Sequence, residues 1–501
     1  MKDAIKRTII VALGVILQFG FFILIQLYFH DKITIIRIIY NLLSISIILK
    51  IIKDSTSLSN DLPWIILILL FPIFGTILLI TLGTNYAKNK LIKNINNTEK
   101  NYQKYLTQNP QIQEEINHKE LDNLKYIINY SKYPVTTNNT IKYYNLGDKF
   151  YPQLLESLQK AEKYIFMEYF IINKGLMWDG ILKILKEKAK QGIEIRIIYD
   201  DMGSIAMLSQ KYPQELKKYG IKCIPFNKVS PFKGIFMNNR DHRKITIIDG
   251  KIAFSGGVNI SDEYININSK YGIWKDNAIQ IEGDAVWNLT TMFLTLWNAN
   301  TNEDKNILKY KYNFPITQKN SGYIVPYGIS PLSKELIAED IYINIINSSK
   351  KYLYIMTPYL IIDTDMINSL IRAAKRGVDV KIIIPGIADK KIVYTQTSSF
   401  FPILTKGGVK IYKYTKGFVH SKVFISDDKR AVVGTINMDY RSLYLHFENG
   451  IYIEQTTQIN PIKEDIEETL KDCQELEAKN IKVGLIKQIW QSILRLFAPL
   501  F

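Results

Sequence analysis

Residues 164–172, YIFMEYFII, have the composition of a buried β-strand, and residues 352–362, YLYIMTPYLII, form a second stretch of the same kind. Each stretch is followed by a predicted helix and then by another apolar strand, QGIEIRIIYDD in the first case and RGVDVKIIIPG in the second. Gly192 and Gly377 stand where the two helices must stop, as glycines at helix C-termini do. Strand, helix and strand in this order is the βαβ pattern, so its repetition predicts two similar α/β domains.

The repeat continues beyond these units. Residues 217–226, KKYGIKCIPF, match residues 405–414, TKGGVKIYKY, and residues 274–282, WKDNAIQIE, match residues 446–454, HFENGIYIE. The matched segments occur in the same order in both halves of the chain. We therefore expect a duplicated fold in which two α/β domains pack face to face and share one active site.

Composition and the repeat together divide the chain into five predicted segments. They are a membrane anchor of two or three helices at 1–85, a polar linker at 86–138, a first α/β domain at 139–315, a second at 316–477, and a C-terminal amphipathic helix at 478–501. In the last segment apolar residues recur every three or four positions with basic residues between them. That pattern suits either an anionic membrane surface or packing against the protein's own core.

Two long apolar runs near the N-terminus predict transmembrane helices. Thr8–Phe29 and Leu62–Gly83 contain no charged residue, and each would span the hydrocarbon core of a bilayer, which is roughly 30 Å thick. Charged and polar residues interrupt the run between them, Ile33–Ile52, so the number of spans stays open. Lysines directly after the last run place the following residues in the cytoplasm. The prediction is a multi-pass protein of the cell membrane with cytoplasmic catalytic domains.

The composition of the chain limits its chemistry. A formal net charge of +17 attracts polyanions, either nucleic acid or anionic lipid, and the apolar N-terminus favours lipid over nucleic acid. The only cysteines, Cys223 and Cys473, lie far apart, so neither a disulfide framework nor a cysteine zinc site is expected. With five histidines in 501 residues, a patterned placement of two of them is informative.

Each half of the chain carries one motif of the form HxKxxxxD. Residues 242–249 read HRKITIID and are followed by GGVN at 256–259, whereas residues 420–427 read HSKVFISD and are followed by GTIN at 434–437. One such motif could be a surface strand with a chance histidine, but two at equivalent places in a repeat are a strong signal. The candidate catalytic residues are His242, Lys244, Asp249, His420, Lys422 and Asp427.

The spacing within each motif assigns different roles to its members. In a strand, residues two apart share a face, so His242 and Lys244 point the same way. Asp249 has the opposite parity and opens an Asp-Gly turn, which places it at the end of the strand rather than beside its own histidine. We expect Asp249 to fix the turn or to hold a neighbouring backbone segment, and Asp427 to do the same in the second half.

Bringing the two motifs together places two imidazoles, two ammonium groups and the amides of Asn259 and Asn437 around one cavity, which suits a phosphodiester substrate. Lysines act as point charges on nonbridging oxygens, while one histidine attacks phosphorus and the other protonates the leaving alcohol. The amides help to bind the substrate and to stabilise developing charge, and no metal or other cofactor is required. Each imidazole also needs a carboxylate to fix its tautomer. The repeat matches Asp276 with Glu448, which are either these orienting groups or surface charges where strands open.

These motifs resemble those of the phospholipase D superfamily, and longer stretches resemble bacterial cardiolipin synthases. The stretches are WIILILLFPIFGTILLITLG, NNRDHRKITIIDGKIAFSGGVNISDEY, YGIWKDN and GTINMDYRSLYLHFENG. The resemblance implies two phospholipase D-type α/β domains and transfer of a phosphatidyl group between two phosphatidylglycerol molecules through a covalent phosphohistidine. It further implies that His242 is the nucleophile and His420 the acid, with His242 oriented by Glu448 and His420 by Asp276.

One departure from the superfamily pattern and several alternatives remain. Many members have serine after the first glycine of the GxxN element, whereas Gly257 and Thr435 stand there, so a hydrogen bond from position 257 is in doubt. A phospholipase D-type hydrolase would carry the same motifs, and a nuclease or a silent lipid-binding scaffold fits less well. The expected partners are phosphatidylglycerol and anionic membrane lipids, without nucleic acid, and the oligomeric state stays open.

Overall fold

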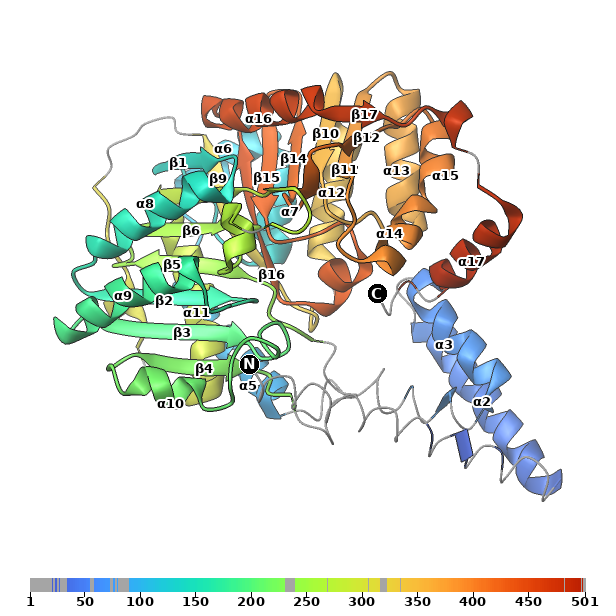
Figure 1. Ribbon diagram of the computed structural model, residues 1–501, viewed down its shortest axis with the longest axis horizontal. Helices are drawn as coiled ribbons and strands as arrows, with labels where there is room; N and C mark the ends of the chain where they lie inside the picture. The colour runs from blue at the N-terminus through green and yellow to red at the C-terminus, as the bar shows by residue number, and fades with distance from the viewer. Residues whose placement is uncertain are drawn as a thin grey trace.

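The structure of the 501-residue chain is a computed structural model. It describes residues 34–54, 58–72, 90–229, 239–267, 269–304, 306–315, 322–333, 335–481, 483–496 and 498, with a few isolated residues between 20 and 79. Two mixed β-sheets with helices on their faces lie side by side, that of the first half at the left of Figure 1 and that of the second half at the right. The chain thus has the two α/β domains that the repeat predicts.

The first sheet has seven strands in the order β1-β8-β6-β5-β2-β3-β4. β2, β3 and β4 run parallel to one another, and the remaining neighbours pair antiparallel. β2 is buried along its whole length because helices cover both faces of the sheet. The strands are β1 (Asn139–Tyr144), β2 (Tyr164–Tyr169), β3 (Glu194–Asp200), β4 (Lys222–Phe226), β5 (Lys244–Ile248), β6 (Ile252–Gly256) and β8 (Ala278–Gly283).

The second sheet repeats the first and adds one edge strand. Its order is β17-β12-β11-β10-β14-β15-β16-β9, so that β9, β16, β15, β14, β10, β11 and β12 occupy the places of β1, β8, β6, β5, β2, β3 and β4. The parallel and antiparallel pairings also correspond. The strands are β9 (Tyr323–Ile329), β10 (Tyr352–Met356), β11 (Asp379–Pro385), β12 (Lys410–Tyr414), β14 (Val423–Ser426), β15 (Arg430–Gly434), β16 (Glu448–Glu454) and β17 (Cys473–Glu475).

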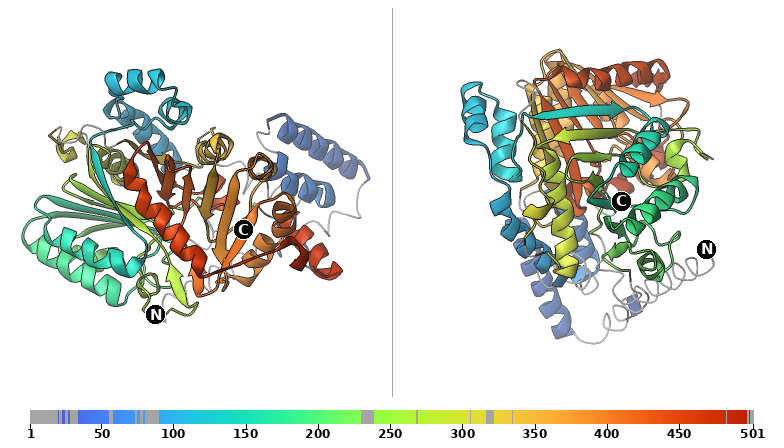
Figure 2. Two further views of the ribbon diagram at one scale, coloured as in Figure 1. Left: turned by 90° about the horizontal axis from the view of Figure 1, so that it is seen from above. Right: turned by 90° about the vertical axis from the view of Figure 1, so that its left-hand side faces the viewer.

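Helices cover the outer face of each sheet and fill the space between the two. α8 (Gly147–Gln159) and α9 (Leu176–Lys190) pack outside the first sheet, and α12 (Ile337–Ser348) and α13 (Thr364–Lys375) pack against the second (Figure 2). α11 (Val286–Thr301) belongs to a core that contains residues of both sheets. The two domains therefore share part of their hydrophobic core, while each also has a core cluster of its own.

Glycines end the crossover helices, as the sequence predicts. Gly192 and Gly377 follow α9 and α13 with φ angles of 82° and 90°, a left-handed conformation that glycine adopts without steric cost. Their backbone N–H groups donate to carbonyl oxygens of the last helical turn, those of Ala189 and Ala374. Each crossover can therefore turn directly into the next strand of its sheet.

The segment expected to be a solvated linker, 86–138, differs from that expectation. It forms α5, α6 and α7, and Ile116, Leu124 and Ile127 are fully buried in the core of the second domain. Polar residues dominate the composition, but the apolar residues lie on one face of each helix, which is enough to bury it. The bounds are α5 (Lys90–Tyr102), α6 (Pro110–His118) and α7 (Asp122–Ser131).

The prediction of a multi-pass protein of the cell membrane with cytoplasmic catalytic domains is wrong. Among the described residues, none of the helices combines the length and the apolar character needed to cross a bilayer. α2 (Thr34–Asp54) has 21 residues but contains Lys50 and Lys53, and α3 (Leu58–Leu70) has only 13, or about 20 Å. Most of Thr8–Phe29 and the last part of Leu62–Gly83 lie outside the described residues.

The C-terminal amphipathic segment contains α17 (Leu485–Leu496), which packs on the second domain along a narrow strip. Gln491 donates to Ser398 at 3.0 Å, and Gln396 donates to the backbone carbonyl of Leu494 at 3.1 Å. The apolar side chains at the start of the helix, among them Leu485 and Ile486, are exposed. Packing against the protein's own core thus accounts for one strip of the helix and not for the rest.

Candidate active site

Each HxKxxxxD motif leads into the central part of its sheet. β5 begins at Lys244 and lies between β2 and β6, and β14 begins one residue after Lys422 and lies between β10 and β15. His242 and His420 therefore stand just ahead of equivalent strands, with only 7% and 6% of each residue exposed. Both lysines are buried as well, and each ammonium group donates to the backbone carbonyl of the histidine two residues before it.

Backbone hydrogen bonds between the halves fix the position of both histidines. The N–H of His242 donates to the carbonyl oxygen of Phe447 at 2.9 Å, and the N–H of His420 donates to that of Lys275 at 2.7 Å. Lys275 ends β7 (Ile273–Lys275), which pairs in parallel with β13 (Gly417–Val419) of the other half. In both cases the residue after the acceptor is one of the two carboxylates that the repeat matches.

Each imidazole contacts the carboxylate supplied by the opposite half. Nδ1 of His242 lies 2.9 and 3.0 Å from the two carboxylate oxygens of Glu448, and Nδ1 of His420 lies 2.6 Å from Oδ2 of Asp276. Thr435 donates its hydroxyl to Glu448. A neutral imidazole that donates from Nδ1 keeps the lone pair on Nε2 free, so both rings are oriented for nucleophilic or proton-transfer chemistry.

Burial sets the ionisation of the histidines and lysines. Loss of hydration lowers the pKa of His242 to about 3 and that of His420 to about 4, more than their carboxylate partners raise them. Burial also lowers the pKa of Lys244 to about 7 and that of Lys422 to about 8. At neutral pH the imidazoles are therefore neutral and hold a lone pair, while the lysines are close to their titration range.

The two carboxylates stay ionised although they are buried. Burial by itself would raise the pKa of Asp276, but the neighbouring His420 and Lys422 outweigh burial and lower it. For Glu448, too, burial by itself would raise the pKa. The charge of His242 and its hydrogen bond outweigh burial and hold this pKa well below its usual range. The site thus contains two fixed anions that stabilise positive charge on the imidazoles.

Asp249 and Asp427 do not reach the histidines. Both have positive φ angles, 55° and 56°, at the ends of their strands. Asp249 accepts the backbone N–H groups of residues 162–164 at 2.7–2.8 Å, and Asp427 accepts those of residues 350–352 at 2.7–2.9 Å. Each carboxylate ties the end of a motif strand to the start of the antiparallel strand beside it, β2 or β10.

The two asparagines of the GxxN elements differ in their contacts. The Asn259 amide accepts the backbone N–H of Ile171 at 3.1 Å and donates to the hydroxyl of Tyr264 at 2.8 Å. Asn437 is buried, and among the described residues its Oδ1 has no hydrogen-bond partner. Asn437 therefore has an amide oxygen without a hydrogen bond in the described part of the chain, while much of the Asn259 amide is engaged in holding the loop beside His420.

A steric clash explains why position 257 has glycine rather than a residue with a hydroxyl group. A Cβ atom on Gly257 would lie 2.0 Å from Oδ1 of Asp276, far inside van der Waals contact. The aspartate side chain is shorter than that of Glu448, so its backbone must come closer to deliver a carboxylate to the histidine. The second half has room for Thr435 and gains the hydrogen bond from its hydroxyl to Glu448.

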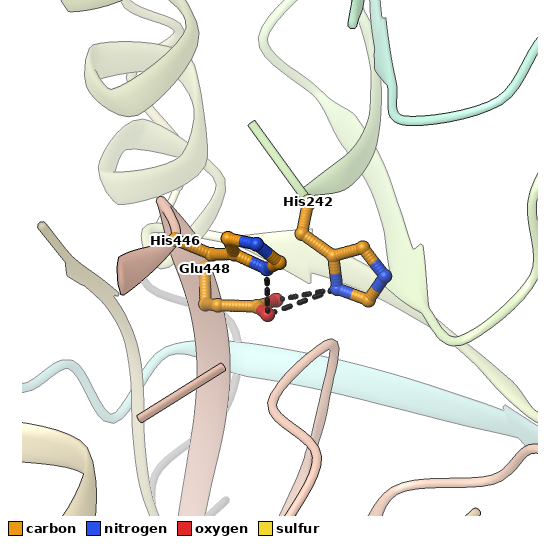
Figure 3. A group of neighbouring side chains, drawn as sticks. All are labelled: His242, His446 and Glu448. Atoms are coloured by element: carbon orange, nitrogen blue, oxygen red, sulfur yellow. Dashed lines mark hydrogen bonds and ion pairs between the residues drawn. The ribbon is translucent and has the colours of Figure 1, made fainter. Parts of the chain in front are cut away.

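His446 is a residue to which the sequence assigned no role. Its Nδ1 lies 3.8 Å from Oε1 of Glu448, and its ring centre lies 5.6 Å from that of His242 (Figure 3). His446 precedes Glu448 by two positions, where the first half has Trp274 before Asp276. The match of HFENGIYIE with WKDNAIQIE was the available signal, because the segment that supplies an orienting carboxylate also brings its neighbours to the site. His242, His446 and Glu448 form a possible set of metal ligands.

Comparison with known proteins agrees with this arrangement. The family described as cardiolipin synthase, PLD-like domain, matches residues 154–297 and 342–470. A cardiolipin synthase of Halalkalibacterium halodurans is 33% identical over 88% of this chain and 89% of its own, and a probable cardiolipin synthase of Bacillus subtilis is 33% identical over 91% and 92%. An uncharacterized protein of Streptococcus mutans is 42% identical over 90% of this chain and 99% of its own.

The fold also has a solved counterpart. The crystal structure of a phosphatidylserine synthase of Haemophilus influenzae superimposes with a TM-score of 0.57 over 76% of this chain and 98% of that one, at 14% identity. So low an identity shows only that the fold is shared. The family match over both domains and the 33% identity over most of the chain go further, and they show that this protein belongs to the cardiolipin synthases with phospholipase D-like domains.

Proposed function

We propose that the chain is a phosphatidyltransferase that converts two phosphatidylglycerol molecules into cardiolipin and glycerol through a phosphohistidine. The observation that carries this proposal is the pair of imidazole–carboxylate contacts, each made between the two halves, in one buried site with two lysines. Relatives named as cardiolipin synthases support the same reaction. The phospholipid class of the substrate follows from the family as well.

In the first step Nε2 of His242 attacks the phosphorus atom of one phosphatidylglycerol. A nitrogen–phosphorus bond forms, and the bond from phosphorus to the headgroup glycerol oxygen breaks. His420, protonated in the complex, gives its proton to that oxygen, and glycerol leaves. The phosphatidyl group is then attached to His242, and the Glu448 carboxylate stabilises the positive imidazole.

The second step reverses the roles of proton donor and acceptor. A hydroxyl of a second phosphatidylglycerol headgroup gives its proton to the now neutral His420, and its oxygen attacks phosphorus. The nitrogen–phosphorus bond breaks, cardiolipin leaves, and His420 has regained the proton that it gave up in the first step. One phosphodiester is exchanged for another, so the reaction is close to balanced in free energy and glycerol can drive it backwards.

The remaining polar groups hold the phosphate and its developing charge. The ammonium groups of Lys244 and Lys422 lie two residues from the histidines and contact nonbridging oxygens, and the Nδ2 group of Asn437 donates a further hydrogen bond to the phosphate. A bound phosphodiester is itself an anion. It raises the pKa of His420 from its depressed value, so that this imidazole gains its proton together with the substrate.

The acceptor decides whether the enzyme synthesises or hydrolyses. A net charge of +17 favours anionic phosphatidylglycerol, so the lipid acceptor reaches the phosphohistidine at a higher local concentration than its bulk value. Incubation of the full chain with labelled phosphatidylglycerol vesicles tests this directly. We expect cardiolipin and glycerol as products, with less cardiolipin when glycerol is added. Phosphatidic acid as the main product, without an effect of glycerol, would assign the chain to the hydrolases instead.

A further inference from the structure

The side chain of His446 is buried, and its contact with Glu448 is long, at 3.8 Å from Nδ1 to Oε1. Only 8% of the residue is exposed, and neither ring nitrogen has a hydrogen-bond partner among the described residues. A buried polar group of this kind costs stability unless something satisfies it. The mechanism proposed above gives His446 no task, so its position beside Glu448 and His242 needs another explanation.

The three side chains converge through one carboxylate (Figure 3). Glu448 contacts Nδ1 of His242 at 2.9 Å through Oε1, and the same oxygen lies 3.8 Å from Nδ1 of His446. One possible ligand atom from each residue lies within 4.8 Å of the other two, and all three residues are buried. Two imidazoles and one carboxylate are also the ligand set of known mononuclear zinc sites.

We propose that His242, His446 and Glu448 bind a zinc ion, and that the bound ion switches off the nucleophile. Zinc holds nitrogen and oxygen ligands at about 2.0–2.2 Å, so the ligand atoms of a tetrahedral site lie about 3.3 Å apart. The distances from Oε1 of Glu448 to the two histidines, 2.9 Å for His242 and 3.8 Å for His446, are respectively shorter and longer than this value. The widest separation between two of the ligand atoms is at most 4.8 Å, which exceeds the tetrahedral value by about 1.5 Å or less. Rotation of the side chains can close this difference.

The effect on catalysis follows from the tautomers of imidazole. A neutral histidine carries one proton, either on Nδ1 or on Nε2. When zinc occupies Nδ1 of His242, the proton moves through solvent to Nε2, with no net release from this residue. Nε2 then has no lone pair with which to attack phosphorus. This consequence rests on the proposed function, whereas the binding of zinc does not.

The duplicated fold provides an internal comparison. The position of His446 in the first half is taken by Trp274, whose ring centre lies 5.5 Å from that of His420. An indole offers no lone pair to a metal. Among the residues that the structure describes, the pair of His420 and Asp276 therefore lacks a third ligand, and we expect one zinc ion per chain rather than two.

Direct binding tests the site without reference to turnover. Full-length protein is stripped with a chelator and titrated with Zn²⁺ by calorimetry, and with Co²⁺ for the visible absorption bands of a tetrahedral site. The variants are His446→Asn and His446→Gln, each with its fold checked by circular dichroism. The matched control is His118→Asn, because His118 is exposed and lies 3.9 Å from Glu114, a histidine–carboxylate pair on the surface.

We expect one ion per chain, with an affinity at least about 100-fold lower in both His446 variants and unchanged in His118→Asn, because loss of an outer partner alone costs 10–100-fold. Zinc should also inhibit phosphatidyl transfer by the wild-type chain, and a chelator should reverse the inhibition. Binding that is equal in the His446 variants, or absent in the wild type, would overturn the site. Zinc binding through His446 in a chain that makes no cardiolipin would leave the site intact and overturn the proposed function.

Discussion

At the scale of single residues, the two carboxylates that contact the histidines should matter for rate rather than for folding. Glu448→Gln removes the charge that stabilises the imidazolium of His242 but keeps the shape of the side chain. The equivalent change in serine proteases lowers the rate about 10⁴-fold, and we expect at least about 100-fold here. Steady-state transfer assays and melting curves measure the two effects. A variant with full activity would contradict the orienting role of Glu448.

The motif aspartates should behave in the opposite way. Asp249→Asn weakens three hydrogen bonds from backbone N–H groups, so the free energy of unfolding should fall by about 1–3 kcal/mol. Asp427→Asn in the second half is the matched variant and should lose a similar amount. Thermal denaturation measures both. An inactive Asp249→Asn protein with unchanged melting would show that this residue takes part in the chemistry.

Position 257 tests the steric reason for the missing hydroxyl. Gly257→Ala places a methyl group against Asp276, so the aspartate must move and His420 loses its partner. We expect a loss of activity of at least about tenfold, whereas Thr435→Ala removes one hydroxyl and should cost less. Transfer assays on both variants measure the two losses of activity. Equal activity of Gly257→Ala and the wild type would mean that Asp276 can be displaced without consequence.

The charge of the lysines should set the alkaline limit of activity. Burial lowers the pKa of Lys422 to about 8, so its positive charge is present below that pH and is lost as the pH rises through it. Lys244, whose pKa burial lowers to about 7, loses its charge first, so kcat/KM should fall from about pH 7 and more steeply above about pH 8. Lys422→Arg keeps its charge throughout this range, so any activity it retains should show the first decline and lack the second. A pH profile that is the same for both proteins would remove Lys422 from the binding of the phosphate.

At the scale of elements, the helices of the expected linker should contribute to stability. Leu124 of α7 is fully buried against the second domain, and Leu124→Ala should lower the free energy of unfolding by about 2–5 kcal/mol. Asn129, exposed on the same helix, is the matched control, and Asn129→Ala should stay within about 0.5 kcal/mol. Chemical denaturation measures both changes. Equal stability of the two variants would mean that this segment is a solvated linker that contributes nothing to stability.

The elements also show what the sequence could predict and what it could not. Alternating parity and turn residues placed Asp249 at a strand end, and the repeat matched Asp276 with Glu448, because both arguments use local spacing. The burial of Ile116 and Leu124 was missed because average composition hides a narrow apolar face. His446 was missed because His242 comes from a distant part of the chain and because the matching residue of the first half, Trp274, gives no hint of such a role. The apolar runs likewise predicted membrane-spanning helices, whereas neither α2 nor α3 combines the length and the apolar character needed to cross a bilayer.

At the scale of the whole molecule, the two halves depend on each other for one site. His242 takes its carboxylate from the second half and His420 takes its own from the first, within one chain. Mixing His242→Ala protein with His420→Ala protein should therefore restore no activity, since neither chain then contains a complete site. Transfer assays on the mixture, with each variant alone as the control, measure this. Recovery of activity would mean that the site forms between chains.

The central claim is that His242 carries the phosphatidyl group while His420 moves the proton, and one measurement tests both parts. A phosphatidyl ester of p-nitrophenol has a leaving group that departs without protonation, so a His420→Asn variant should still react with it once. We expect a burst of one nitrophenolate per chain and, after quenching, a phosphatidyl group on His242 in the peptide mass spectrum. Absence of the burst, or a label on any residue other than His242, would contradict the account.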